Sequence, residues 1–523
     1  MGLSDLPFTK HFTKNLAICT FLIGISVFNY GFDQTGFSTI QAMDPFIDRF
    51  GTRDPKTKKM EITPTNLSLL NSLPRITFGL GILMGGVLGE RFGRRPIYVL
   101  MLVICIMGTI ISYTAKTFTQ VVVGRMLNQM YTGMEGWLVP MFQAEIIPAQ
   151  IRGVVVVSYV FNHVFGSFVM ACVTYKTSQW MTDASWQIPI AVMFIIPSFA
   201  LALSFLIPES PRWLVRKGKE EKALTMMRYI YGSNPSYAPE RELALLKESL
   251  ELEMEKGSWK DLVRGTNLRR TAIIFIISCG NQLTGQAFST QYGTVFVKSI
   301  GTLNPYTFTL VANALGCLGP FMSWFLIEPV GRRNMYLYAG GMSCACLFVM
   351  GGLGVPVSTF GNKAGIIAMT ILYPLFYTMS FGGITPVIVA EVPSLKLRDK
   401  SAVIGWSMQN VCAFLVTFTV PYLINVKYAG LGSKVGFIYG SFALLFLIWA
   451  WFYLPEVRRR SLEEIDEMFI EKVPTRKFKT WTSSNMNSAG AKITDLEAHA
   501  ANAGKLSDLP EEKAEIVHEE NIQ

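Results

Sequence analysis

The chain has 523 residues, of which 50% are hydrophobic and only 16% are charged, and its mean hydropathy is +0.34. Soluble proteins usually carry about a quarter charged residues, so the composition argues against a soluble enzyme. The formal net charge of +10 does not indicate nucleic acid, because basic loops beside anionic lipid explain it in a membrane protein. We therefore expect a lipid bilayer as partner.

Long and almost uncharged stretches follow one another along the chain. Segments such as 97–113 and 187–207 approach the ~20 residues that a helix needs to cross about 30 Å of hydrocarbon. They lack the polar stripe of a soluble core helix. We predict an all-α membrane protein with twelve transmembrane helices. The predicted spans are 15–36, 66–88, 97–115, 119–142, 154–175, 187–207, 271–296, 306–327, 335–355, 364–389, 401–424 and 436–454.

A charged stretch divides these spans into two groups of six. The predicted parts are a cytoplasmic N-terminus (1–14), a first six-helix half (15–207), a cytoplasmic helical linker (208–270), a second half (271–454), and a cytoplasmic helix with a disordered tail (455–523). The short loops beside the linker are richer in Lys and Arg than those opposite, which places the linker and both termini in the cytoplasm. The basic loop 37–65 argues against this orientation.

Charged features recur in the same order in both halves. The pattern ExxGRR occurs at 90–95 and again 238 residues later at 328–333, and two further matched features follow at offsets of 246 and 247 residues. A duplicated chain is typical of secondary transporters. We predict a cytoplasmic gating network that closes this side in one state; the alternative is a set of charges that only fixes topology. Its residues are Glu90, Arg94, Arg95, Glu145, Arg152, Glu209, Arg212, Glu328, Arg332, Arg333, Glu391, Arg398 and Glu456.

Four motifs resemble those of the sugar porter family of the major facilitator superfamily, in the style of its fungal members. They are GERFGRR (89–95), GR (124–125) leading to VPMFQAEIIPAQIRG (139–153), PESPRWL (208–214) and LPEVRRRSLEEIDEMF (454–469). The resemblance covers about residues 15–469. It implies the major facilitator fold and alternating access around a central sugar site. Val160 and Pro386 stand where the family usually places a sugar-contacting glutamine and an aromatic residue, so the pocket differs from that of a typical glucose carrier.

Two charges are candidates for proton coupling. A carboxylate within a span is costly, by about 2.5 kcal/mol or more, so Asp33 in the first span needs a partner or a function. In the family's symporters the matching acid takes up the proton, and the arginine of span four, here Arg125, switches its affinity. The resemblance thus implies the proton as coupling ion and no other cofactor. The alternative is a static ion pair.

Three further groups lie within predicted spans. Arg75 and Glu135 are expected either to pair with each other or to act separately, with Arg75 facing Asp33 and Glu135 serving as a second protonatable or substrate-facing group. His163 is the only histidine within a predicted span, and a role in pH dependence competes with simple packing. No metal site is expected, since none of the eight cysteines forms a CxxC pair.

Sugars are bound by amides and hydroxyls at their OH groups and by aromatic rings at their C–H faces. Asn281, Gln282 and Gln286 are predicted to share one helical face, with Gln282 the first candidate for sugar contact. Phe381 and Trp406 are the predicted stacking residues. The remaining candidates are Asn162, Thr284, Asn313, Gln409 and Asn410. Any one of these amides has the alternative role of an interhelical hydrogen bond.

These features predict a plasma-membrane secondary transporter of a sugar or polyol that works as a monomer by proton symport. One alternative is a passive facilitator of a sugar, a polyol or a cyclic acid such as quinate. Another is a non-transporting nutrient sensor on the same fold, although the tail is short for one. An enzyme is not expected, because the sequence has no evident nucleophile triad, metal cluster or phosphate loop.

Overall fold

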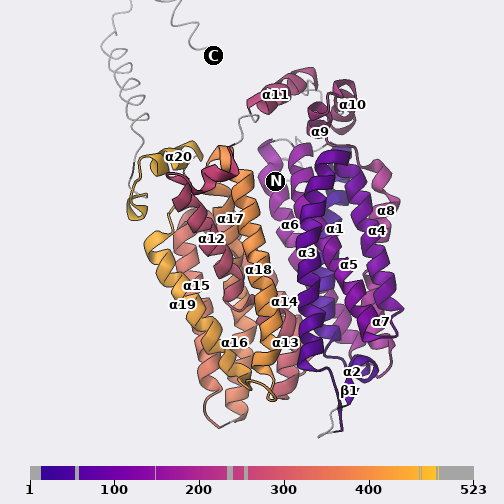
Figure 1. Ribbon diagram of the computed structural model, residues 1–523. Helices are drawn as coiled ribbons and strands as arrows, with labels where there is room; N and C mark the ends of the chain where they lie inside the picture. Colours follow the sequence, from indigo (N-terminus) through magenta and orange to yellow (C-terminus); the bar gives the residue numbers. More distant parts are fainter. Residues whose placement is uncertain are drawn as a thin grey trace, which may run out of the picture.

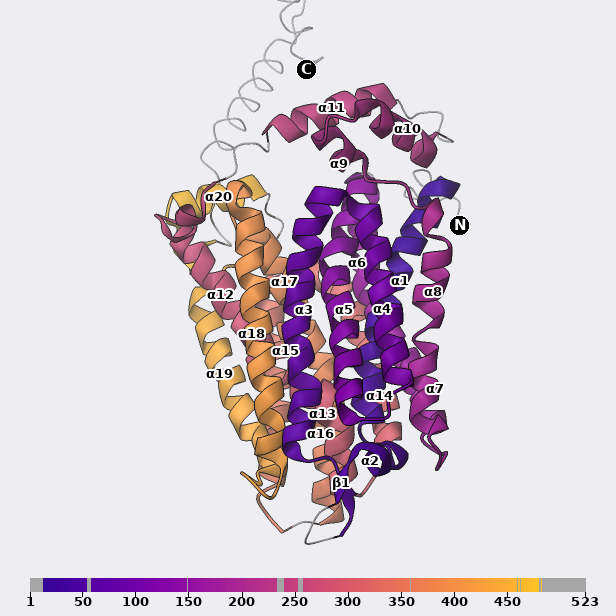
Figure 2. The ribbon, with the colours of Figure 1, turned by 45° about the vertical axis from the view of Figure 1, so that its right-hand side comes forward.

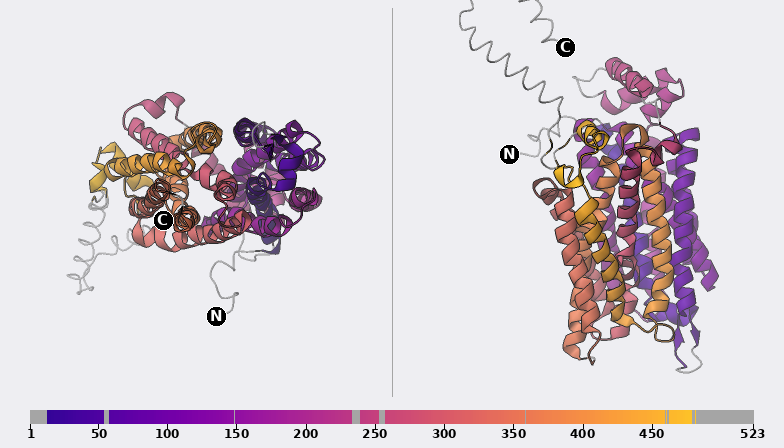
Figure 3. Two further views of the ribbon diagram at one scale, coloured as in Figure 1. Left: turned by 90° about the horizontal axis from the view of Figure 1, so that it is seen from below. Right: turned by 60° about the vertical axis from the view of Figure 1, so that its left-hand side comes forward.

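The computed structural model describes residues 13–53, 58–147, 149–232, 239–252, 257–357, 359–458, 460, 462–478 and 481. These residues form two groups of roughly parallel helices that stand side by side (Figure 1; Figure 3, left). Each group has its own hydrophobic core. The described chain is therefore built as two halves, as the internal repeat predicts.

The first half contains six crossings of the bundle among the described residues. They are α1 (Lys14–Ile40), α3 (Pro64–Phe92), α4 (Arg94–Tyr113), α5 (Phe118–Ile146), α6 (Ala149–Thr177), and α7 (Ala184–Val192) followed by α8 (Ile195–Ala202). The predicted span 187–207 is thus two short helices, and a turn of 3₁₀ helix, η3 (Ser204–Leu206), ends it. Thr13, Thr63 and Thr117 cap the N-termini of α1, α3 and α5 through their side chains.

The second half repeats this plan. Its crossings are α12 (Asn267–Leu283) followed by α13 (Gln286–Ile300), α14 (Pro305–Val330), α15 (Arg332–Leu353), α16 (Phe360–Met379) followed by α17 (Phe381–Glu391), α18 (Arg398–Ile424) and α19 (Val435–Tyr453). With each broken helix counted once, the described residues make twelve crossings, which confirms the predicted count. Eight of the helices or helix pairs are long and apolar enough to span a membrane on length and composition alone.

One end of the bundle, here called the linker end, carries the segments that connect and flank the halves (Figures 1 and 2). They are α9 (Pro211–Arg216), α10 (Glu220–Tyr231), α11 (Pro239–Leu252), η4 (Trp259–Val263), η5 (Leu395–Leu397), α20 (Leu462–Ile470) and η7 (Thr475–Lys477). The α10 helix docks on the first half, since the Tyr231 hydroxyl donates to the Ile146 carbonyl and Thr13 donates to that of Ile230.

The described part of the predicted segment 455–523 is held against the second half. Arg269 of α12 donates to the Val473 carbonyl (2.9 Å) and to the Thr475 hydroxyl (2.5 Å), and its guanidinium lies over the Phe469 and Phe478 rings. These contacts hold the chain against the second half as far as Phe478. Residues 482–523, like the start of the chain at 1–12, lie outside the described part.

The opposite end, here called the hairpin end, contains the folded loop between α1 and α3. This loop forms α2 (Asp44–Phe50) and a small antiparallel hairpin of β1 (Thr52–Arg53) and β2 (Met60–Glu61). The short η6 (Gly432–Lys434) begins the final crossing at this end. The basic loop 37–65 is thus an ordered element over its described residues, and its acidic groups reach the second half, as shown below.

The halves meet along three helix pairs, α3 with α18, α6 with α14, and α1 with α13; Figure 2 shows α3 beside α18. Two carbonyl contacts tie these pairs at mid-depth. Asn410 of α18 donates to the Arg75 carbonyl of α3 (3.1 Å), and the Cys317 thiol of α14 lies 3.7 Å from the Val164 carbonyl of α6. The pairs α3–α18 and α6–α14 are here called the two seams. The internal duplication relates them, because α3 and α14 are the second crossings of their halves and α6 and α18 are the fifth.

Candidate functional site

A buried ion pair organises the linker end of the first half. The Arg94 guanidinium binds Glu145 in bidentate geometry, with Nε–Oε2 at 2.8 Å and Nη2–Oε1 at 2.7 Å. Arg94 is 0% exposed and also donates to the Gly89 carbonyl. The Glu209 carboxylate accepts the backbone N–H groups of Arg94 (2.8 Å) and Arg95 (3.3 Å). An acidic side chain thus caps the N-terminus of α4, where the helix dipole favours negative charge.

The second half repeats this arrangement residue by residue. Arg332 binds Glu391 through Nε–Oε2 at 3.2 Å and Nη2–Oε1 at 3.0 Å. Glu456 accepts the backbone N–H groups of Arg332 (3.0 Å) and Arg333 (3.1 Å) at the N-terminus of α15. The repeated residues therefore make the same contacts in both halves. One arginine bridges two helices, and a glutamate caps the helix that carries this arginine.

A glycine makes room for each capping glutamate. Gly93 has φ +104° and Gly331 has φ +95°, values that L side chains rarely adopt. A Cβ at Gly93 would lie 2.4 Å from a Glu209 carboxylate oxygen, and one at Gly331 would lie 2.5 Å from a Glu456 oxygen. Burial raises the pKa of Glu209, while the N–H groups of Ser210, Arg94 and Arg95 and the charge of Arg94 act in the opposite direction.

The other predicted network residues have different environments. Glu328 pairs with Arg332 (3.0 Å), Arg333 donates to the Trp451 carbonyl (2.6 Å), and Arg398 donates to that of Ala390 (2.9 Å). The Glu90 side chain is exposed, Arg212 is half-buried and has an interaction, and the Arg152 side chain lies outside the described part. None of the network ion pairs among the described residues joins the two halves.

The contacts between the halves lie instead at mid-depth and at the hairpin end. Lys298 of α13 donates to the Asp44 carboxylate (2.6 Å) and the Ala42 carbonyl (2.6 Å). Gln41 donates to the Gln291 carbonyl (2.5 Å). Further links are Ser68 to the Phe418 carbonyl (2.8 Å) and Lys427 to Glu61. The halves are therefore bound to each other on the side opposite the charged network.

Asp33 and Arg125 are both buried in the first half, but each has a different partner. One Asp33 oxygen accepts the Gln129 amide (2.5 Å), and the other has no hydrogen-bond partner. Arg125 donates to the Asn71 amide oxygen (2.7 Å) and lies over the Phe37 ring at 4.8 Å. Within the described ranges no ion pair joins the two, yet their charges are close enough to interact electrostatically.

The sequence allowed two arrangements of Glu135 and Arg75, an ion pair or separate roles. In the structure the two side chains form no ion pair. Glu135 is 0% exposed; it accepts the Tyr159 hydroxyl at 3.4 Å, and its second oxygen has no hydrogen-bond partner. Arg75 has an aromatic neighbour, with its guanidinium 6.0 Å from the Phe78 ring centroid. The helices α3 and α5 pack closely, but the two side chains do not meet in an ion pair.

His163 belongs to a small polar cluster on α1 and α6. Its ring stacks on Tyr30 with centroids 4.2 Å apart, and Nε2 lies 2.8 Å from the Gln34 amide oxygen. Asn162 on the same helix donates to the Gly24 carbonyl (3.3 Å). His163 therefore has specific polar and aromatic partners, whereas Asn162 makes the interhelical bond that was its alternative role.

The predicted shared face of Asn281, Gln282 and Gln286 is wrong, because the helix breaks between them. α12 ends at Leu283, Gly285 adopts φ +93°, and α13 begins at Gln286. Asn281 donates to the Phe381 carbonyl (2.8 Å), and Gln282 donates to the Asn281 amide oxygen (2.7 Å). The two neighbouring amides thus form a chain, and Gln286 lies beyond the break.

Phe381 is not available for stacking on a ligand. It is 0% exposed and packs edge-on against Tyr336 at 4.9 Å, whereas Trp406 of α18 is 43% exposed. The remaining candidates are dispersed: Thr284 is buried, Asn313 accepts from Thr35 across the halves (3.5 Å), Asn410 makes the seam contact above, and Gln286 and Gln409 are half-buried.

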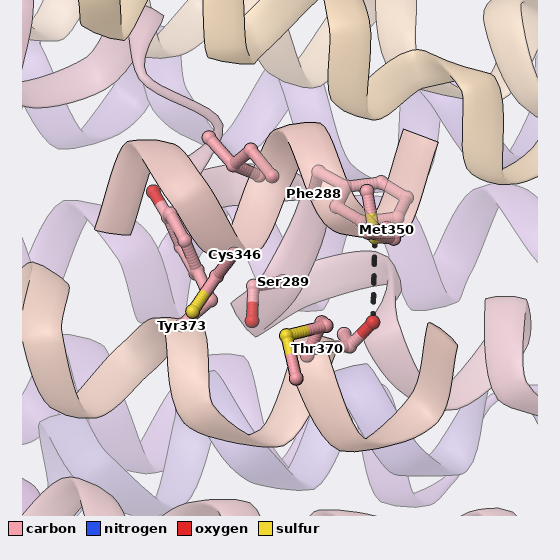
Figure 4. A pocket seen from close by; sticks show the side chains of 8 residues that line it. Phe288, Ser289, Cys346, Met350, Thr370 and Tyr373 are labelled. Carbon is pink, nitrogen blue, oxygen red and sulfur yellow. Dashed lines mark hydrogen bonds between the residues drawn. The ribbon is translucent and has the colours of Figure 1, made fainter. Parts of the chain in front are cut away.

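A small pocket lies within the second half rather than between the halves (Figure 4). It lies among α13, α15 and α16, and its lining includes Phe288, Ser289 and Tyr373. Thr370 donates to the Met350 sulfur across it (3.4 Å). Its lining comes from one half alone, so it is separate from the charged cluster on the first half.

Reasoning from sequence missed several partners of the charged groups. Gln129 and Asn71 hold Asp33 and Arg125, and Tyr377 donates to the Asn281 carbonyl (2.8 Å). Gln129 lies four residues after Arg125, one helical turn away, and this spacing was a usable signal. In the described part of the chain, no three His, Cys, Asp or Glu side chains are grouped to hold a metal ion.

Comparisons with known proteins place this fold in a family. The model of the family "Sugar (and other) transporter" matches residues 18–469. MFS transporter fmqE of Aspergillus fumigatus is 29% identical over 91% of this chain and 89% of its own length. The general alpha-glucoside permease of Saccharomyces cerevisiae is 28% identical over 88% of this chain and 76% of its own.

Other fungal proteins and a solved structure agree with this placement. Hexose transporter HXT9 of Saccharomyces cerevisiae is 26% identical over 94% of this chain and 88% of its own length. The inward open structure of the xylose transporter XylE from E. coli superposes with a TM-score of 0.72 at 20% identity, covering 87% of this chain and 99% of that chain, and shows the same fold. The chain belongs to the sugar transporter family: it is an integral membrane transporter of the major facilitator fold, not an enzyme.

Proposed function

We propose that this protein carries a sugar or a related polyol across the membrane by proton symport, with Asp33 as the proton-binding group. The observation that carries the proposal is the geometry of Asp33, a fully buried carboxylate with one free oxygen and no ion pair among the described residues. The fungal relatives that match most of this chain are named as alpha-glucoside, maltose and hexose carriers, which supports a carbohydrate as cargo.

Arg125 supplies the switch in this proposal. It is bound to Asn71 and not to Asp33, and a nearby cation favours the charged form of a carboxylate. When Arg125 moves toward Asp33, the ionised acid is stabilised and its proton leaves; when Arg125 returns to Asn71, the acid binds a proton. Proton affinity is thereby linked to the arrangement of the helices.

The positions of the contacts between the halves favour an inward-facing state. The halves are linked at the hairpin end by Lys298, Gln41 and Ser68, and the ion pairs of the linker end stay within each half. With the linker end in the cytoplasm, as the distribution of Lys and Arg predicts, the closed side faces outward. Alternating access then requires the hairpin-end contacts to break when the cytoplasmic side closes. We infer a functional monomer, because each half has its own core and the helix pairs between the halves complete the bundle. A plasma-membrane location follows from the proposed role as a carrier that takes up carbohydrate.

Radiolabelled uptake tests this proposal in cells that lack their own sugar carriers. The panel contains hexoses, pentoses, disaccharides, polyols and cyclic acids, each with and without a protonophore, for the wild type and Asp33→Asn. Surface labelling confirms expression of both proteins. We expect accumulation of at least one compound, abolished by the protonophore and by Asp33→Asn.

Other outcomes would lead to different functions. Uptake that survives both the protonophore and Asp33→Asn would identify a passive facilitator with a structural Asp33. A surface-expressed wild type that takes up none of the panel would contradict transport of a carbohydrate and favour a sensor.

A further inference from the structure

Arg75 is a cation inside the bundle that has no acidic partner within the described ranges. It lies near the middle of α3, about 16 Å along the helix from its start at 1.5 Å per residue. No ion pair involves it there, and its guanidinium lies 6.0 Å from the ring centroid of Phe78 on the same helix. A charged arginine at this depth costs about 2.5 kcal/mol or more, so it needs a role.

Its position is at the meeting point of the halves. The Arg75 carbonyl accepts the Asn410 amide of α18, which fixes this turn of α3 against the second half. The guanidinium is close enough to interact electrostatically with groups from both halves. They are Tyr30, Asp33, Arg125 and His163 in the first half, and Tyr292 and Tyr377 in the second.

The two carboxylates in the same region are bound to other groups. Asp33 accepts the Gln129 amide, and Glu135 accepts the Tyr159 hydroxyl. Asp33 also lies within electrostatic range of both Arg125 and Arg75. Among the described residues Arg75 therefore makes no ion pair with either carboxylate, and its positive charge is not neutralised by a direct contact.

The internal repeat argues against a purely structural role for this charge. The residue 238 positions after Arg75 is Asn313, which bonds to the Thr309 carbonyl of its own helix (2.8 Å) and to Thr35 across the halves (3.5 Å). A neutral amide thus suffices to pack the corresponding helix at the matching seam. The cation is an addition specific to the first half.

We propose that Arg75 binds a carboxylate of the cargo, so that the transported compound is a polyhydroxylated acid, either a sugar acid or a cyclic hydroxy acid. This inference rests on the proposed transport function and narrows its substrate class. A guanidinium binds carboxylates in bidentate geometry. Groups that can bind hydroxyls lie within electrostatic range of it, namely Tyr30, His163 and Tyr377. His163 contacts Gln34, and Tyr377 donates to the Asn281 carbonyl, so further amides adjoin these groups.

A matched pair of ligands tests the proposal directly. Galacturonate and galactose differ only in having a carboxylate or a hydroxymethyl group at one carbon, as do glucuronate and glucose. Purified protein is reconstituted in liposomes, and exchange of each labelled compound is measured at equal pH on both sides, so that proton coupling does not drive it. The variants are Arg75→Gln, Arg75→Lys and, as a control, Arg91→Gln, which removes an exposed arginine from the linker end of the same helix.

We expect the wild type to prefer the acid over its matched hexose by about tenfold or more, as for a hydrogen bond between charged partners. Arg75→Gln should lower exchange of the acid far more than exchange of the matched hexose and so abolish the preference. Arg75→Lys should keep part of the preference, and Arg91→Gln should keep all of it. Elution of each variant as a single peak confirms folding.

Two results would overturn the proposal and leave transport intact. A third would overturn the proposed transport function, and the three are distinguishable. A wild type that exchanges the hexose as well as or better than the acid contradicts the acidic cargo, with transport of a sugar intact; this holds even if Arg75→Gln does not fold. Equal losses for acid and hexose in folded Arg75→Gln assign Arg75 a structural role. If folded wild type exchanges none of the four compounds, nor any of the carbohydrates and acids of the uptake panel, the proposed transport function itself fails.

Discussion

Arg94 and Arg332 occupy equivalent places in the two halves, and each binds one glutamate through two hydrogen bonds while a second glutamate caps its helix. At mid-depth the halves differ. The residues 246 positions after Arg125 and Glu135 are Ile371 and Phe381, and the counterpart of Arg75 is Asn313. The duplication is thus retained in the ion pairs that hold helices together at the linker end. It is lost at mid-depth, where the first half carries Arg75, Arg125 and Glu135.

The difference indicates a division of work between the halves. The repeated clusters join neighbouring helices inside a half, so each half can move as a body. The charged groups Asp33, Arg75, Arg125 and Glu135 all belong to the first half, whereas the second offers amides and phenols such as Gln282 and Tyr377. We infer that the first half carries the ion chemistry and that the second contributes neutral contacts.

Removing the buried arginine of the first half should have the largest effect on stability. Arg94 and Glu145 side chains are 1% and 5% exposed, against 10% and 24% for Arg332 and Glu391. Breaking a fully buried pair leaves an uncompensated charge and costs about 3–5 kcal/mol, so Arg94→Ala should lower the thermal stability of the purified protein strongly.

The equivalent change in the second half sharpens this comparison. Arg332→Ala should cost less, because its partners are better solvated, and Arg91→Ala, which removes an exposed arginine beside Arg94, should be nearly neutral. Thermal unfolding of the three variants in one detergent gives the order. If Arg332→Ala destabilises as much as Arg94→Ala, burial is not what distinguishes the two clusters.

A smaller loss of stability is expected where α3 and α5 touch backbone to backbone. A Cβ at Gly133 would lie 2.1 Å from the Phe78 carbonyl oxygen. Since neither backbone can yield easily, Gly133→Ala should cost about 1–3 kcal/mol. The control is Gly316→Ala on α14, where a Cβ meets nothing within 4 Å and where alanine should be neutral or slightly stabilising. Equal melting temperatures for the two variants would contradict the close approach.

The smallest effect should come from the ion pair between the halves at the hairpin end. The Lys298 and Asp44 side chains are 33% and 62% exposed, so the pair is worth about 0.5–1 kcal/mol. Lys298→Ala should therefore raise the population open at this end by about two- to fivefold. The readout is the rate at which a maleimide modifies Ser68→Cys, a buried site at the α3–α18 seam, relative to the same protein without that cysteine.

Charge exchange provides the control for that experiment. Asp44→Lys alone should act like Lys298→Ala, and combining it with Lys298→Asp should restore slow modification. An unchanged rate in Lys298→Ala would mean that Gln41 and the hairpin hold this end closed without the ion pair.

The order of helices and the repeated charged features were predictable because local sequence patterns indicate both. A span shows as a continuous apolar run, and the duplication shows as offsets between identical motifs. The breaks were harder to predict, since Gly285 and Ser380 interrupt spans that remain uncharged across the break. That is why Asn281 and Gln286 were wrongly placed on one face.

The partners of the buried charges were not predictable in the same way. Asp33, Arg125, Arg75 and Glu135 stand out in the sequence because charge is rare inside a span, but which of them meet depends on side-chain directions in three helices. In the structure, Asp33 accepts a hydrogen bond from Gln129, and Arg125 donates one to Asn71. Phe381 was misjudged for a similar reason, because its burial against Tyr336 is a long-range contact.

Proton movement coupled to cargo tests the role of Asp33 most directly. Liposomes containing the protein and a pH-sensitive dye receive, without any imposed gradient, a compound that the uptake panel has identified as cargo. We expect cargo entry to carry protons with it in the wild type, and we expect Asp33→Asn to exchange labelled cargo without moving protons. Proton movement of wild-type size in Asp33→Asn would contradict the assignment of Asp33 as the coupling group.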